Sequence, residues 1–473
     1  MKLPNALRIT ACLTAALLLG ACSTARLSAR PDTALPERWQ ATLPHGGDVQ
    51  ALTDWWRRFD DPQLAELIAQ AQASSPTLAQ ALARIAQGRA GLQSAQAQRW
   101  PGVTLNVQGT RGASVVGGFS PTTQAGAAAD ASWEVDLFGG TRAAVAAAAA
   151  RHERAALDWH AARVSLAADV AQTYVALRSC EAQRAVLDDD ADSQRQSAAL
   201  TREKVRVGFE SPANGALADG AAADAGNRAI TQRADCDVLL QSLGVLSGQG
   251  AEALRTWLAP RSGQLPQPAA FAVPALPAQL LAQRPDIAAA ERDVVAAASD
   301  VGVADAARYP RLTFNGSLGI AGLRVAGSTR DGNTWGFGPA LSLPLFDAGL
   351  RAAQQDAAMA RYDEARAALD GRLRAAIGVV EEALLRLDAD TRREAHALRA
   401  AQGFRDYYAA AEQRWRVGAG SLIDREDARR IALTAQSALL TVQRERVAAW
   451  ITLYRALGGG WSASHAAPAA NTP

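Results

Sequence analysis

The sequence is poor in lysine, methionine and aromatic residues. Lysine occurs only at Lys2 and Lys204, methionine only at Met1 and Met359, and aromatic residues are 5% of the chain. Arginine therefore carries nearly all the positive charge, and the formal net charge is only +2 over 473 residues. Nucleic-acid binding needs a clear basic excess, so we expect no nucleic-acid partner.

The motifs of common enzyme sites are also absent. The chain has no HExxH, no Gly-x-Ser-x-Gly, no CxxC and no glycine-rich loop followed by lysine. The histidines are few and scattered, and we expect His152 and His160 to lie on a helix surface rather than bind a metal. The acidic run at 188–192 is expected to be a solvated helix face. We predict no catalytic residue, no metal and no enzyme activity.

No apolar run is long enough to cross a bilayer, which takes about 20 residues. The run Ile9–Leu19 follows a basic start and ends in Leu19-Gly20-Ala21-Cys22, the pattern of a lipobox. We therefore predict a lipoprotein signal peptide over 1–21 and a diacylglycerol with an acyl chain such as palmitate on Cys22. Ser23 in place of an aspartate favours sorting to the outer membrane. The alternative is an ordinary signal peptide with a chance cysteine.

The alanine-rich remainder of the chain is an internal repeat. Pro76 and Pro101 correspond to Pro285 and Pro310, each shifted by 209 residues, and further matches follow in the same order. After Pro101 and after Pro310, apolar and polar residues alternate with the period of a strand. Each half then returns in a second alternating run, so each half predicts one β-hairpin, at about 102–138 and 311–346.

A proline-free stretch of about 70 residues follows each hairpin, over 139–208 and 347–418. At 1.5 Å per residue such a helix reaches about 100 Å. Each stretch ends at a glycine, and Ser421 with Asp424 predicts a capping box where the next helix begins. The expected domains are an N-terminal lipid-anchored equatorial segment (22–61), a first repeat (62–248, tip about 208–212), an equatorial linker (249–275), a second repeat (276–460, tip about 418–421) and a disordered tail (461–473).

Cysteine is scarce too, with four in all. Cys12 leaves with the signal peptide and Cys22 is the predicted lipid site, so Cys180 and Cys236 remain. Gly208, at the expected tip, is equidistant from both in sequence, and such residues lie side by side on the arms of a helical hairpin. We predict a Cys180–Cys236 disulfide, with two buried free thiols as the alternative.

Four strands with one apolar face cannot stand alone in lipid, because open sheet edges leave backbone groups without hydrogen bonds. Three copies would supply twelve strands, with polar and glycine positions facing the lumen and large apolar side chains facing lipid. Helices of about 100 Å exceed the membrane core of about 30 Å, so they must project into the periplasm.

The lipobox, the early WWRRFDDPQL at 55–64 and the repeated proline-bounded helices resemble the outer-membrane efflux proteins of the TolC-like superfamily. The match is to the lipoprotein branch, the OprM/NodT-like proteins. The resemblance implies an α+β membrane protein that is internally duplicated and forms a homotrimer. A twelve-stranded β-barrel would continue into a periplasmic α-helical barrel, with a mixed equatorial belt between them.

The resemblance also implies passive export of small molecules through this tunnel, with a periplasmic adaptor and an inner-membrane transporter as partners. Family members carry a Gly-x-x-x-x-Leu-x-x-x-Asp-Ala-x-Arg pattern near the second tip, matched here by Gly418, Ile423, Asp427, Ala428 and Arg430. We expect Asp424 and Asp427 to be gate carboxylates facing the lumen and Arg430 to be a tethering partner. Alternatives are metal-ion export, type I protein secretion, or a non-conducting structural lipoprotein with coiled-coil helices.

Overall fold

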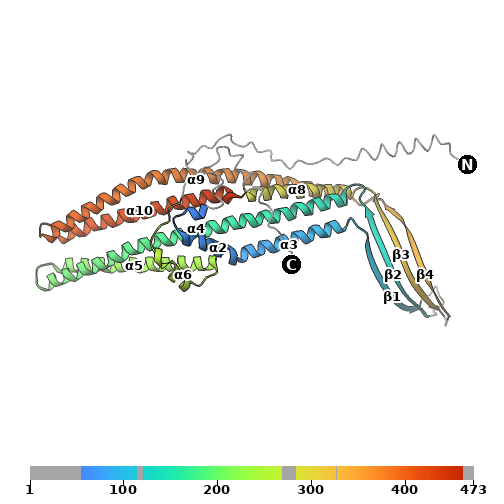
Figure 1. Ribbon diagram of the computed structural model, residues 1–473, viewed down its shortest axis with the longest axis horizontal. Helices are drawn as coiled ribbons and strands as arrows, with labels where there is room; N and C mark the ends of the chain where they lie inside the picture. Colours follow the sequence, from blue (N-terminus) through green and yellow to red (C-terminus); the bar gives the residue numbers. More distant parts are fainter. Residues whose placement is uncertain (1–54, 114–120, 269–283, 326–327, 462–473) are drawn as a thin grey trace. The chain divides into compact units, whose positions relative to one another are not determined.

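The computed structural model describes residues 55–113, 121–268, 284–325 and 328–461. The signal peptide, Cys22 and the tail from residue 462 lie outside them. In chain order the elements are η2 (Trp55–Arg58), α2 (Pro62–Ser74), α3 (Pro76–Ala97), β1 (Gly102–Ala113), β2 (Pro121–Val135), α4 (Gly140–Arg206), α5 (Pro212–Ser247), α6 (Ala251–Leu258), η4 (Ala259–Arg261), α8 (Pro285–Ala306), β3 (Arg311–Val325), β4 (Ser328–Ser342), α9 (Leu350–Arg416), α10 (Leu422–Ala456) and η5 (Gly458–Gly460) (Figure 1).

The chain packs as two compact units that cut across the sequence repeats. Among the described residues, one unit holds 83–156 and 288–371, with all four strands. The other holds 55–82, 157–268, 284–287 and 372–461. Helices α4 and α9 each contribute to both units, so the repeats interleave and are not separate domains.

The two hairpins occupy the places that alternation predicted. They form one antiparallel sheet in the order β1-β2-β3-β4. The central pairing of β2 with β3 joins the two repeats and aligns Trp133 with Phe314. Within the described residues β1 and β4 are edge strands, so their outer backbone groups have no strand to bond.

The two long helices end at glycines, as the sequence indicates. Helices α4 and α9 each have 67 residues, or about 100 Å of helix. Gly208 and Gly418 follow them with φ of 80° and 75°, a left-handed conformation that glycine adopts without strain. Ser211 then caps α5, its hydroxyl accepting a hydrogen bond from the Asn214 amide at 3.2 Å. None of the described helices is long and apolar enough to cross a membrane.

The segment expected to be a linker at 249–275 begins as structure. Its first part forms α6 and η4, and its last residues lie outside the described ranges. Leu254 and Leu258 are buried in the same core as α4 and α5. The four prolines of the segment suggested a linker throughout, but the amphipathic stretch between Gly250 and Pro260 has room for two helical turns.

We call the unit without strands the helical unit. Its main core contains aromatic residues of η2 and α10. Trp55 is fully buried and stacks on Tyr454 of α10, with ring centroids 5.1 Å apart. Trp56 and Phe59 lie in the same cluster. Four of the few aromatic residues therefore cluster where η2 packs against α10.

A disulfide joins α4 to α5. The Sγ atoms of Cys180 and Cys236 are 2.10 Å apart and their Cα atoms 5.6 Å apart. Both residues are buried in the main core. The bond is the one that the symmetric placement about Gly208 predicted.

Removing this disulfide should destabilise the hairpin. The bond closes a sequence separation of 56 residues, for which the loss of loop entropy in the unfolded chain stabilises by about 4 kcal/mol. We expect the Cys180→Ala/Cys236→Ala double variant to unfold at a lower temperature than the wild type. Thermal unfolding in detergent, monitored by circular dichroism, measures this difference. A reducing agent should lower the unfolding temperature of the wild type and leave the double variant unchanged; equal wild-type unfolding with and without reductant would contradict the prediction.

His160, expected on the surface, is buried instead. Its ring lies 4.9 Å from that of Trp159 and 6.2 Å from that of Trp461, and the residue is 6% exposed. Burial, and then the charge of Arg163, lower its pKa from 6.5 to about 4. The apolar surroundings were hidden from the sequence because Trp461 is distant in the chain.

The lowered pKa of His160 predicts acid sensitivity. Between pH 6.5 and 4 the unfolded chain binds a proton that the folded chain excludes, so stability falls as pH drops through this window, by up to about 3 kcal/mol. We expect thermal unfolding between pH 7 and 4 to show a weaker pH dependence in His160→Gln than in the wild type. His396→Gln, at an exposed histidine, is the control and should keep the wild-type slope.

Candidate functional site

The register of the sheet sorts its side chains onto two faces of opposite character. On one, the polar face, aligned rows run Thr104–Asp130–Ser317–Gly336 and Asn106–Ala128–Gly319–Thr334. On the other, the apolar face, rows run Val103–Ala131–Gly316–Phe337 and Leu105–Ala129–Leu318–Trp335. This separation across four strands is the one that the alternation of the sequence indicated.

The polar face is held by hydrogen bonds between strands. The Asn106 amide donates to the Asp130 carboxylate at 2.7 Å, and the Ser132 hydroxyl donates to Asn315 at 2.9 Å. Glycine and alanine fill many remaining positions, so little side-chain volume stands above this face. A surface of this kind suits contact with water.

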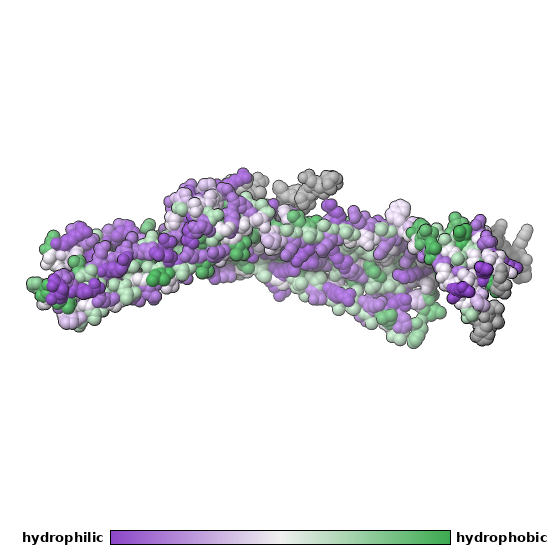
Figure 2. Space-filling model, turned by 90° about the horizontal axis from the view of Figure 1, so that it is seen from below, coloured by the Kyte–Doolittle hydropathy of each residue, from purple (hydrophilic) through white to green (hydrophobic). Residues whose placement is uncertain are grey.

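The apolar face carries large side chains that no part of the described chain covers. Trp335 is 75% exposed and Phe337 is 84% exposed. Figure 2 shows hydrophobic residues gathered where the helices adjoin the sheet. Leu345 and Phe346, which follow β4 in the chain, are also largely exposed. Exposed apolar area of this extent marks a contact with lipid or with another protein.

At the second tip the structure gives Asp424 a capping role. Its backbone amide donates to the Ser421 hydroxyl at 3.0 Å, and its carboxylate accepts from the Ser421 amide at 3.2 Å. These hydrogen bonds hold the pKa of Asp424 below its usual value. The capping box predicted from the sequence is confirmed, and the carboxylate stays exposed beside it.

Asp427 and Arg430 pair with each other one turn further along α10. The guanidinium lies 3.0 Å from the carboxylate, and both side chains are more than half exposed. An exposed pair of this type stabilises a helix by at most about 1 kcal/mol. Both groups therefore remain available to other contacts at the tip, and their orientation toward a lumen stays a prediction.

The contact that joins the two helical hairpins near the tips uses neighbours of these residues. Arg425 lies over the Trp415 ring of α9, 4.8 Å from its centroid, and donates to Glu426 at 2.7 Å. Glu426 in turn accepts from Ser197 of α4 at 2.9 Å and from Gln194 at 3.0 Å. We call these five residues the inter-hairpin clamp.

A second contact between the hairpins corrects the expectation of a solvated acidic run at 188–192. Asp190 is only 3% exposed. Its carboxylate lies 3.2 Å from Arg228 of α5 and 3.8 Å from Arg429 of α10. Arg429, also buried, donates to the Asp189 carbonyl at 2.7 Å. No local signal marks these partners, since they come from two other helices, α5 and α10.

The chain matches a known protein family along most of its length. A model for outer membrane efflux proteins matches residues 67–249 and 276–459, which is most of the chain. The chain belongs to the outer membrane efflux protein family. The two matched segments correspond to the two repeats.

Relatives and solved structures agree with this assignment. Outer membrane protein OprJ of Pseudomonas aeruginosa is 32% identical over 463 residues, 94% of each chain. Solvent efflux pump outer membrane protein SrpC of Pseudomonas putida is 28% identical over 471 residues, covering 95% of this chain and 98% of that protein. The structure of the outer-membrane channel OprN is similar with a TM-score of 0.79 and 27% identity, covering 93% of this chain and 100% of that chain.

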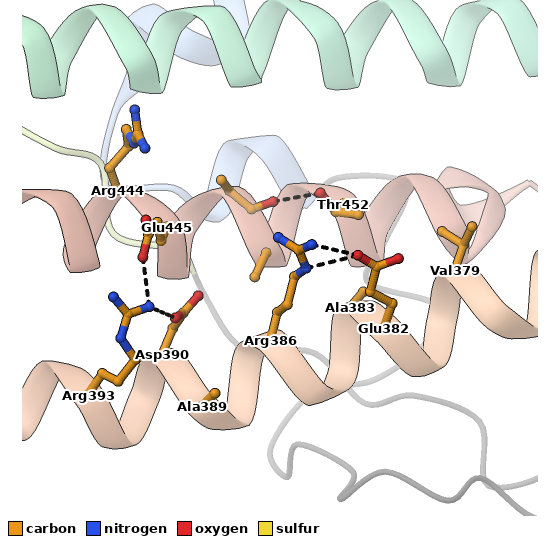
Figure 3. A pocket seen from close by; sticks show the side chains of 12 residues that line it. Val379, Glu382, Ala383, Arg386, Ala389, Asp390, Arg393, Arg444, Glu445 and Thr452 are labelled. Carbon is orange, nitrogen blue, oxygen red and sulfur yellow. Dashed lines mark hydrogen bonds and ion pairs between the residues drawn. The ribbon is translucent and has the colours of Figure 1, made fainter.

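This outer membrane efflux protein also has a surface groove of about 580 Å³ between α9 and α10 (Figure 3). Its acids are already paired: Glu382 with Arg386 at 2.7 Å, and both Asp390 and Glu445 with Arg393 at 2.7 Å. Within the described ranges no group of three or more acids, histidines or cysteines is placed to hold a metal ion. The groove resembles a helix-packing surface more than a site for chemistry.

Proposed function

We propose that three copies of the chain close into a twelve-stranded barrel in the outer membrane, with β4 of one copy paired to β1 of the next. The observation that carries this proposal is the sheet itself: two open edges, one polar face and one exposed apolar face. Closure gives every edge a partner, which a membrane requires. The polar face then lines the lumen and the apolar face contacts lipid.

The helices of each copy would form the periplasmic part of the tunnel, and the segment at 22–61 with the linker would contribute to an equatorial belt. We also propose a diacylglycerol and acyl chain on Cys22. The lipobox supports this anchor, and the residue lies outside those the structure describes. With both features, the chain would be anchored in the outer membrane and its helices would extend into the periplasm.

In this arrangement the protein passes small toxic molecules outward without chemical change. A periplasmic adaptor and an inner-membrane transporter would deliver the cargo, as expected for an exit duct of a tripartite system. The relative from Pseudomonas putida is named for solvent efflux, which supports small molecules as the cargo class.

The tips of the helical hairpins would form the periplasmic gate. We propose that the Asp424 and Asp427 carboxylates face the lumen there and that Arg430 tethers them across copies. Their exposure supports this role. An exposed carboxylate at the tip can still contact a neighbouring copy, although it already has a partner within its own copy. The inter-hairpin clamp would hold each copy's own hairpins in the closed position.

Planar-bilayer conductance of the detergent-extracted protein, together with its oligomeric mass, tests this function. We expect a trimer with small conductance, and a larger conductance in Asp424→Ala or Asp427→Ala because contacts between copies are lost at the gate. A trimer whose conductance ignores both substitutions would keep the tunnel and move the gate elsewhere. A monomer that never conducts would overturn the duct and favour a structural lipoprotein.

A further inference from the structure

The apolar face of the sheet contains a groove at the end nearest the helices. Two adjoining cavities, of about 320 and 250 Å³, share Ala131, Gly316 and Phe337 as lining residues. Small residues of the two central strands form the floor. The walls are large apolar side chains from all four strands: Val103 of β1, Trp133 of β2, Phe314 and Leu318 of β3, and Trp335 and Phe337 of β4. We call this feature the apolar groove.

We propose that the apolar groove binds one acyl chain of a phospholipid from the periplasmic leaflet of the outer membrane. The proposal rests on the proposed function, which turns this face toward lipid. The groove lies beside the first residues of β1 and β3, next to the helices and hence in the periplasmic leaflet. It is open on the face of the sheet, whereas a neighbouring copy in the proposed trimer pairs with the backbone edges of β1 and β4, so a second copy does not fill it.

A counter-charge for the phosphate stands at the same end. The indole nitrogen of Trp133, a groove residue, donates to the backbone carbonyl of Arg99 at 3.0 Å, which fixes Arg99 beside the groove. The Arg99 side chain is exposed and forms no ion pair among the described residues. Its counterpart in the second repeat, Arg308, is engaged by Gln355 and Asp305.

The free guanidinium favours a phospholipid over the protein's own N-terminal lipid. A diacylglycerol on a cysteine has no phosphate, whereas a phospholipid offers both the acyl chain for the groove and an anionic oxygen for Arg99. One phospholipid per copy is therefore the expected stoichiometry.

Native mass spectrometry of the delipidated trimer with added dioleoylphosphatidylglycerol tests the site. We expect the wild type to retain one lipid per copy and Ala131→Phe to bind it about tenfold more weakly, since the phenyl group fills the groove. Gly316→Leu provides a second variant on another strand: a Cβ at Gly316 meets only the Cβ of Phe337, at 3.9 Å. Arg99→Gln should weaken binding of the same lipid, and Cys22→Ala should leave it unchanged.

Ala127→Phe is the matched control, because Ala127 lies on the same strand and face but does not line either cavity. It should retain lipid as the wild type does. Equal lipid retention in wild type, Ala131→Phe and Gly316→Leu would overturn the site, and so would an equal loss in Ala127→Phe. The oligomeric mass and conductance of the same samples test the proposed duct independently. A conducting trimer that retains no lipid would contradict the lipid site alone, and a monomer that never conducts would contradict the duct.

Discussion

Arg425→Ala is expected to open the channel and raise its single-channel conductance about tenfold or more. The substitution removes two contacts of the clamp. One is between the Arg425 guanidinium and the Trp415 ring of α9, and the other is the hydrogen bond from Arg425 to Glu426 within α10. The substitution also removes a 3.3 Å hydrogen bond to the Ser197 hydroxyl on α4. Among the described residues, Arg425 carries the only guanidinium at the tip that contacts α4, α9 and α10 together. The closed arrangement of the two hairpins therefore loses this shared contact.

The size of the effect follows from the number of copies. A hydrogen bond to a charged group stabilises by about 1.5–3 kcal/mol when it is shielded from water, and the Arg425 side chain is only 12% exposed. Three copies share one opening in the proposed trimer, so the losses add to roughly 4.5–9 kcal/mol. A shift of about 5.5 kcal/mol takes a two-state equilibrium from 1:99 to 99:1.

Arg386→Ala is the matched control, since it removes an arginine from the same hairpin that pairs only within its own helix, with Glu382. Its conductance should equal that of the wild type. Comparison with Asp427→Ala then separates two ways of holding the gate. A strong effect of Arg425→Ala alone locates the restraint within each copy, and a strong effect of Asp427→Ala locates it between copies. Wild-type conductance in Arg425→Ala would rule out the clamp as a restraint.

The features that the sequence predicted well are those with local physical causes. Alternation with a period of two identifies β1 and β3, and the prolines at 101 and 310 set where they begin. Gly208 and Gly418 mark the helix ends because a left-handed residue is needed there. The disulfide followed from the symmetry of a hairpin about Gly208.

The features that the sequence missed depend on partners that are distant in the chain. Asp190 looked like part of a solvated run, but α5 and α10 each bring an arginine to it. No sequence pattern connects Arg425 and Glu426 to α4, which supplies Ser197 and Gln194 as their partners. His160 is buried by Trp461, which no spacing rule connects to it.

Asp61→Ala is expected to destabilise the helical unit by about 3–5 kcal/mol, because it removes one partner of a buried charged network. Asp61 lies in the stretch WWRRFDDPQL, which stood out in the sequence only by its resemblance to the family. The structure shows what this carboxylate contacts. The carboxylate caps α2 by accepting from the Gln63 amide at 3.0 Å. It also accepts a 2.5 Å hydrogen bond from the Tyr174 hydroxyl on α4 and lies 3.7 Å from Arg261.

The same network continues to Arg178, which is fully buried and donates to Gln63 at 2.8 Å and to Glu181 at 2.9 Å. Loss of Asp61 leaves the Tyr174 hydroxyl without its acceptor in an apolar core. We expect the unfolding temperature to fall by about 10 °C, measured by circular dichroism of the detergent-extracted protein. Asp60→Ala is the control, because Asp60 is exposed and contributes only its backbone carbonyl, to Arg261. Equal unfolding temperatures for the two variants would show that the stretch acts through its aromatic residues, with no contribution from the carboxylate.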